Sequence, residues 1–143
     1  MTFRILCSLA ALIALASARA QEADKEVEAR KVALEVAGAF SNDGFKIRDG
    51  HWSGEVKPGE PAVVAVNLYA GNQYWFSAGT DAKNAKFSVQ LHDEYGKPVP
   101  GELYQGDATA AAGVSPTVSG QYFVSLTASE GAAGTYCLAY SYK

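Results

Sequence analysis

Cysteine is scarce in this 143-residue sequence, which contains only Cys7 and Cys137. Cys7 lies in an apolar N-terminal stretch that we expect to be removed, so Cys137 would be the single thiol of the mature chain. A single cysteine cannot form an internal disulfide, and the domain must therefore be stabilised by its core alone. Because Cys137 lies in a strand-like run, we predict that it is a small buried side chain and not a nucleophile.

The sequence has no apolar run long enough to cross a bilayer. The longest, at residues 5–16, has about a dozen residues, whereas a membrane-spanning helix needs roughly 20. Arg4 precedes this run and Ala18-Arg19-Ala20 follows it, which is the small-x-small pattern of a signal peptidase site. We therefore expect residues 1–20 to be a signal peptide, the mature chain to begin at Gln21 without a membrane span, and the protein to be periplasmic or secreted.

Blocks of like charge are also missing. Without Arg4 and Arg19 the mature chain has ten basic residues against fifteen acidic ones, a net charge of −5. The two signs are interspersed, as on an ordinary solvated surface, and the acidic balance makes nucleic acid an unsuitable partner.

Catalytic, metal-binding and phosphate-binding motifs are absent from the sequence. It has two histidines, no Gly-x-Ser-x-Gly turn and no glycine-rich phosphate loop, so we expect no cofactor, no metal site and no catalytic residue. His92 falls on the polar face of a predicted strand and is expected at the surface. His51 lies in the glycine-bracketed segment 49–54, which we expect to be a loop or bulge.

What the sequence does contain begins with a helix. Residues 22–40 repeat apolar side chains at a spacing near 3.6 without a proline, which predicts one amphipathic helix. Ser41-Asn42-Asp43-Gly44 then supplies the turn that ends it. The apolar stripe consists of Val27, Val32, Leu34, Val36 and Phe40 with Ala29, Ala33 and Ala37 between them. Such a stripe must be buried, and we expect it to pack on the domain that follows.

From Phe45 the apolar period changes to two. Alternating runs recur at intervals of about ten residues, separated by turns rich in glycine, proline and asparagine, so the chain is predicted to be mainly β. The economical architecture is an antiparallel β-sandwich over residues 45–143, preceded by the helix and turn at 21–44. The alanine-rich stretch 106–113 is interpreted as a strand or loop. The aromatic residues expected in the core are Tyr74, Phe76, Tyr122, Tyr136 and Tyr140.

From Glu60 onward the sequence resembles the bacterial pre-peptidase C-terminal domain, a secreted, jelly-roll-like β-sandwich. The resemblance rests on the strand and turn at 64–76, the strand and turn at 87–99, and the segments 119–126 and 134–138. In that family the module commonly follows a secreted peptidase, and some members bind collagen or polysaccharide. No enzyme is attached here, so the resemblance implies a stand-alone exported form, and no calcium site is carried over from the family.

Together these observations predict an exported, non-enzymatic binding or accessory module whose ligand is a polysaccharide or a protein surface. Trp75 and Phe123 should point away from the core and would form a binding platform if the helix leaves them uncovered. His51 and Trp52 complete the candidate ligand-binding residues. Two alternatives stay open: a small hydrolase with a site around His51, Asp49 and Ser53, and a structural subunit that docks through the helix at 22–40.

Overall fold

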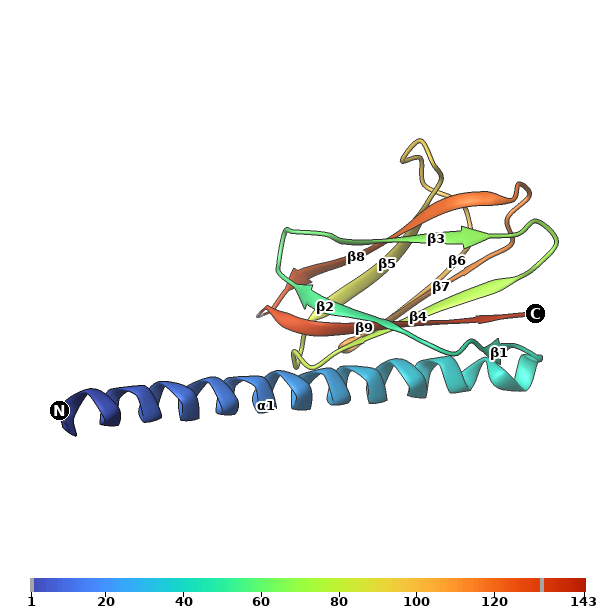
Figure 1. Ribbon diagram of the computed structural model, residues 1–143. Coiled ribbons are helices and arrows are strands. Elements are labelled where there is room, and N and C mark those ends of the chain that lie inside the picture. The colour runs from blue at the N-terminus through green and yellow to red at the C-terminus, as the bar shows by residue number, and fades with distance from the viewer. Residues whose placement is uncertain (1, 132) are drawn as a thin grey trace.

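The computed structural model describes residues 2–131 and 133–143 and shows a helix lying along a two-layered body of strands (Figure 1). Helix α1 spans Thr2–Ala39, and the short 3-10 helix η1, Ser41–Asp43, follows it. The strands are β1 Lys46–Ile47, β2 Trp52–Val56, β3 Ala62–Leu68, β4 Tyr74–Thr80, β5 Lys86–His92, β6 Glu102–Gly106, β7 Thr109–Val114, β8 Gly120–Glu130 and β9 Gly134–Tyr142. The prediction of a mainly β chain with one N-terminal helix is confirmed.

The strands form two antiparallel sheets packed face to face. One is six-stranded, with the order β1-β9-β4-β7-β6, and β2 also pairs with β9. The other is three-stranded, with β8 between β3 and β5. The alanine-rich stretch at 106–113 is largely strand β7. It pairs with β4 in the middle of the larger sheet, where its small side chains pack closely.

The core lies between the sheets and is built from the inward side chains of each strand. Its fully buried members include Phe76, Phe87, Leu91, Leu126 and Leu138. The aromatic residues predicted for the core are confirmed: Tyr74, Phe76, Tyr122 and Tyr136 are buried, and the half-buried Tyr140 packs against them. The period of two alone therefore identified which face of each strand is inward.

The segment around His51 differs from the prediction. We expected residues 49–54 to form a loop or bulge, but Trp52–Gly54 belong to β2, which pairs with β9 from Trp52 opposite Leu138 to Val56 opposite Gly134. The prediction holds for residues 49–51, where Gly50 has a φ of 95°, and it was wrong for Trp52–Gly54 because Gly54 was also interpreted as a turn signal. Gly54 instead lies under the ring of Tyr136, where a Cβ would be only 3.0 Å from Tyr136 Cε1.

Helix α1 packs on the outer face of the six-stranded sheet, mainly against β4 and β9 (Figure 1). The prediction that it docks on its own domain is confirmed, but the side chains that dock are the alanines. Ala29, Ala33 and Ala37 are fully buried, whereas Val27 is 66% exposed. Alanines four residues apart let the helix backbone approach the sheet more closely than valine or leucine would. Val32, Val36 and Phe40 are half-buried beside this contact, and Val27 and Leu34 turn outward.

Small residues on the sheet match the small residues on the helix. Gly79 of β4 has Cys137 as its partner on β9, and Ser77 has Ala139. A Cβ on Gly79 would lie 2.6 Å from the backbone nitrogen of Ala33 and 2.7 Å from the carbonyl oxygen of Ala29. The helix therefore rests almost directly on the backbone of the strand at this point.

The same interface buries two serine hydroxyls. Ser77 and Ser141 are both 0% exposed, and among the residues described neither Oγ has a hydrogen-bond partner. A buried hydroxyl without a partner costs about 1–3 kcal/mol relative to a solvated one. The contact between α1 and the sheet is thus closely packed, but the two unpaired hydroxyls lower the free energy of unfolding.

Replacing Ser77 with alanine should therefore stabilise the protein. The expected gain is about 1 kcal/mol in the free energy of unfolding, because alanine keeps the small volume and removes the unpaired hydroxyl. Urea unfolding followed by circular dichroism measures this change. Ser119→Ala is the matched control: its Oγ accepts a hydrogen bond from the Ala70 amide at 2.8 Å, so this variant should lose stability. A destabilised Ser77→Ala would contradict the interpretation.

The N-terminal half of α1 lies beyond the strands (Figure 1). Residues 13–25 are all exposed, and the first half-buried side chain after them is Glu26. Over the described residues, no helix combines the length and apolar character that crossing a membrane requires. Among the side chains described from residue 13 onward, burial against the sheet begins after the predicted cleavage point.

Candidate ligand-binding site

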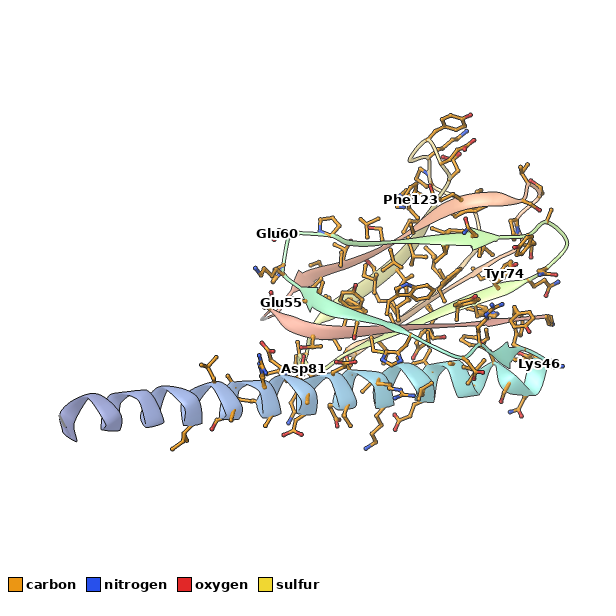
Figure 2. All side chains as sticks on the ribbon, viewed as in Figure 1. Lys46, Glu55, Glu60, Tyr74, Asp81 and Phe123 are labelled. Atoms are coloured by element: carbon orange, nitrogen blue, oxygen red, sulfur yellow. The ribbon has the colours of Figure 1, made fainter. Side chains whose placement is uncertain are left out.

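Trp75 and Phe123 point away from the core, as expected, but from different sheets. Trp75 lies on β4 beneath the end of α1, where its ring stacks on Phe40 with centroids 4.0 Å apart and planes 9° apart. Phe123 lies on β8 of the three-stranded sheet, in the layer away from the helix (Figure 2). The helix covers one ring and leaves the other, so the two rings do not share one platform.

His51 contacts the helix instead of the residues predicted around it. Its Nε2 lies 3.3 Å from Oε1 of Glu26. Hydrogen bonds from His51 and from Ser53 lower the pKa of the Glu26 carboxyl. In the described part of the chain, no hydrogen bond or ion pair joins His51 to Asp49 or to Ser53. The Glu26 carboxylate is the hydrogen-bond partner of both His51 and Ser53. The imidazole is therefore not placed to activate the Ser53 hydroxyl as a catalytic base would.

Trp52 stands at the end of a row of stacked rings. Its ring lies 5.7 Å from that of Tyr140, which in turn lies 5.7 Å from Phe76 in the core. Trp52 is the first residue of β2 and points toward the interior, opposite Leu138. Because β2 is at the border of its sheet, the indole reaches the opening between the two sheets and stays half-buried.

A groove opens at this border, between strand β3 of one sheet and strands β2 and β9 of the other. Its volume is about 400 Å³. The walls carry aromatic rings, two amides and one guanidinium, and the lining residues are Arg48, Trp52, Ala65, Val66, Asn67, Tyr69, Asn72, Tyr74, Tyr140 and Tyr142. Of the candidate residues inferred from the sequence, Trp52 is the one that lines this groove.

The turn between β3 and β4 is fixed in place by Tyr74. The Tyr74 hydroxyl accepts hydrogen bonds from the Tyr69 amide at 3.0 Å and from Nδ2 of Asn72 at 3.1 Å. Tyr74 is buried at the right-hand end of the sandwich, labelled in Figure 2. Tyr69 and Asn72 are therefore held at the groove by a rigid side chain of the core, and little order has to be gained when a ligand binds.

Most of the groove was missed from the sequence. Tyr69 and Asn72 form the two ends of the turn between β3 and β4, and neither was among the ligand-binding residues predicted from the sequence. Arg48 was counted as the polar side of a strand. The signal that could have pointed to the site is the aromatic residue inside a turn, because a loop tyrosine cannot be buried as easily as a strand tyrosine.

No family model matches this sequence, and no curated protein matches it. Among solved structures, the pre-peptidase C-terminal domain of a collagenase from Bacillus anthracis is 19% identical, with a TM-score of 0.50 over 64% of this chain and 87% of that domain. The Yersinia pseudotuberculosis-derived mitogen is 14% identical, with a TM-score of 0.49 over 67% of this chain and 85% of the mitogen. A periplasmic inhibitor of g-type lysozyme from Aeromonas hydrophila is 16% identical, with a TM-score of 0.46 over 66% of this chain and 85% of the inhibitor.

At such low identity a structural likeness concerns the fold and not the function. The likeness to the collagenase domain agrees with the resemblance seen in the strands and turns from Glu60 onward. The chain therefore has a β-sandwich fold like that of the pre-peptidase C-terminal domain, with one helix packed on the outside of its larger sheet.

Proposed function

We propose that this protein is an exported, non-enzymatic binding module that holds a neutral polysaccharide in the groove beside Trp52. The observation that carries the proposal is the composition of the groove: several aromatic rings together with the amides of Asn67 and Asn72 and the guanidinium of Arg48. Aromatic faces pack against the apolar faces of sugar rings, and amide and guanidinium groups hydrogen-bond sugar hydroxyls.

The rigid setting of the groove supports this assignment. Trp52 is braced by Tyr140, and the turn that carries Tyr69 is pinned by Tyr74. Tyr69 is 64% exposed and offers an open ring face at the groove. The nearby charge is limited to Arg48 among the lining residues, so a neutral sugar chain fits better than a strongly anionic one.

Export is part of the proposal. It rests on the basic start, the apolar run and the Ala18-Arg19-Ala20 pattern in the sequence. The exposure of residues 13–20 agrees with it, because cleavage before Gln21 would take none of these described side chains from a buried position. The groove would then meet glycans of the periplasm or of the medium outside the cell.

The two alternatives from the sequence have less support. A hydrolase around His51 would need the imidazole to contact a serine hydroxyl, whereas His51 contacts Glu26 on the helix. For a structural subunit docking through the helix at 22–40, Ala29, Ala33 and Ala37 already lie on the protein's own sheet, which leaves Val27 and Leu34 as the exposed apolar side chains of the stripe.

Removing the Trp52 ring should abolish most of the glycan affinity. The mature protein, residues 21–143, is titrated by calorimetry with soluble oligosaccharides of β-1,4-linked glucose and of β-1,4-linked N-acetylglucosamine. Trp52→Ala should weaken binding about 30-fold, which corresponds to roughly 2 kcal/mol for a buried aromatic contact. Arg48→Ala, at an exposed position outside the core, should weaken binding severalfold without affecting folding.

Trp75→Phe is the matched control for Trp52. These are the only two tryptophans of the chain, and Trp75 stacks on Phe40 away from the groove. The control should bind normally, and its fluorescence, now from Trp52 alone, should change when the oligosaccharide is added. Absence of binding to every glycan, or binding that neither Trp52→Ala nor Arg48→Ala weakens, would overturn the proposal and leave a protein surface as the ligand to be sought.

A further inference from the structure

A second cavity lies at the same end of the sandwich as the groove. It has a volume of about 540 Å³ and lies between the loop from β5 to β6 and the loop from β7 to β8. Its lining combines tyrosine rings, prolines and neutral polar side chains, among them Tyr95, Pro98, Pro116, Gln121 and Tyr122, with the charged residues Asp93, Glu94 and Lys97 on the loop after β5. None of these residues was singled out from the sequence as a ligand contact.

The loops around this cavity are fixed by their own hydrogen bonds. Asp93 Oδ1 accepts from the amides of Tyr95 at 3.0 Å and Lys97 at 2.9 Å. On the other side of the cavity, the Tyr122 hydroxyl donates to the carbonyl of Val118 at 2.6 Å. Tyr95 is nonetheless 86% exposed, so its ring contacts little of the protein and is free to contact a ligand. An exposed ring on a braced loop suits stacking against a sugar.

The groove and the cavity share a wall. Asn67, which lines the groove, is the partner of Gln121, which lines the cavity, in the pairing of β3 with β8. The turn that separates them is tied to the cavity by the hydrogen bond from the Ala70 amide to Ser119 Oγ at 2.8 Å. Cα partners on antiparallel strands lie about 4.5–5.5 Å apart, so the amide side chains of Asn67 and Gln121 lie side by side. This amide pair, the Asn67–Gln121 step, is the polar surface between the groove and the cavity.

We propose that the groove and this loop-end cavity are two consecutive subsites for one neutral polysaccharide chain. The bound stretch of the chain crosses the Asn67–Gln121 step and stacks on Tyr95. The inference rests on the proposed function and extends it: the ligand is an internal stretch of a polymer and not a monosaccharide or a chain end. Occupying two connected subsites with one chain raises the affinity without a change in either subsite.

The test is the dependence of affinity on oligosaccharide length. A disaccharide and a hexasaccharide of the glycan that binds best are titrated into the mature protein and into Tyr95→Ala and Gln121→Ala. The native protein should bind the hexasaccharide at least tenfold more tightly than the disaccharide. Tyr95→Ala and Gln121→Ala should lose most of that advantage and keep the disaccharide affinity. Tyr104→Ala is the control, because Tyr104 is also exposed but lies on the far strand β6.

The outcomes separate this inference from the proposed function. If Trp52→Ala weakens disaccharide binding but the hexasaccharide binds no more tightly than the disaccharide, the groove stands and the second subsite is refuted. The second subsite is equally refuted if Tyr95→Ala and Gln121→Ala leave the hexasaccharide affinity unchanged, or weaken the disaccharide as much as the hexasaccharide. If no glycan binds, the proposed function itself fails.

Discussion

Replacing Gly79 with alanine is expected to force α1 away from the sheet. The new methyl group would meet backbone atoms of Ala33 and Ala29 at 2.6 and 2.7 Å, and backbone atoms in a helix cannot turn aside as a side chain can. Overpacking of this kind costs about 1–3 kcal/mol. At about 2 kcal/mol, the fraction of molecules with the helix undocked would rise roughly 30-fold.

The thiol of Cys137 reports this change directly. Cys137 is the partner of Gly79 across β4 and β9 and is fully buried under the helix, and this burial raises its pKa to about 11. Undocking would expose the thiol and return its pKa toward the ordinary value near 8.5, so both accessibility and thiolate fraction increase. The rate of reaction with an aromatic disulfide reagent at pH 8 measures the change in the mature protein.

Gly120→Ala is the control for this substitution. Gly120 is also in a strand, and a Cβ built there has nothing within 4 Å, so labelling of Cys137 and stability should stay near those of the native protein. Unchanged labelling in Gly79→Ala would show that the helix tolerates the methyl group, and that its contact with the sheet is looser than the geometry indicates.

Replacing Phe76 with alanine is expected to have the largest effect on folding. Phe76 is fully buried and stacks with both Tyr74 and Tyr140, so its loss removes the ring on which the groove residues are supported. Truncation of a buried phenylalanine costs about 3–5 kcal/mol, a large part of the stability of a domain of this size. Urea unfolding of the mature protein measures the cost.

Phe123→Ala is the matched control for Phe76→Ala. Phe123 is a phenylalanine of the outer face, half-buried on β8, and its truncation should cost clearly less than that of Phe76. If the two variants lose similar stability, the core is not centred on the aromatic row. A Phe76→Leu variant, which keeps much of the volume, should recover part of the lost stability and of the glycan affinity.

The architecture could be predicted from the sequence because it depends on local patterns. The alternation through Val64, Val66 and Leu68 places one face of β3 inward whatever the neighbouring strand is, and the same holds for the aromatic residues of the core. The turn at 41–44 could also be predicted, because a glycine after the last apolar position of a helix commonly takes the left-handed conformation that ends it. Gly44 has a φ of 87°, which favours glycine. These features need no knowledge of which strands pair.

The groove could not be predicted because it depends on which strands become neighbours. Trp52 is on β2 of one sheet and Tyr69 directly follows β3 of the other, and only the placement of β2 next to β9, opposite β3, brings both to one opening. The hydrophobic pattern of residues 22–40 also did not predict which face of the helix docks on the sheet. Hydrophobicity favours valine and leucine, whereas the close approach at Gly79 makes alanine the side chain that fits.

The direction of α1 has a practical consequence. The helix enters from the side opposite the turn between β3 and β4, so the beginning of the chain and the groove lie at opposite ends of the body (Figure 1). A tag, bead or sensor surface coupled to residue 21 would leave the binding end facing the solution. Coupling at that position is therefore the orientation of choice for capture assays with large insoluble polymers.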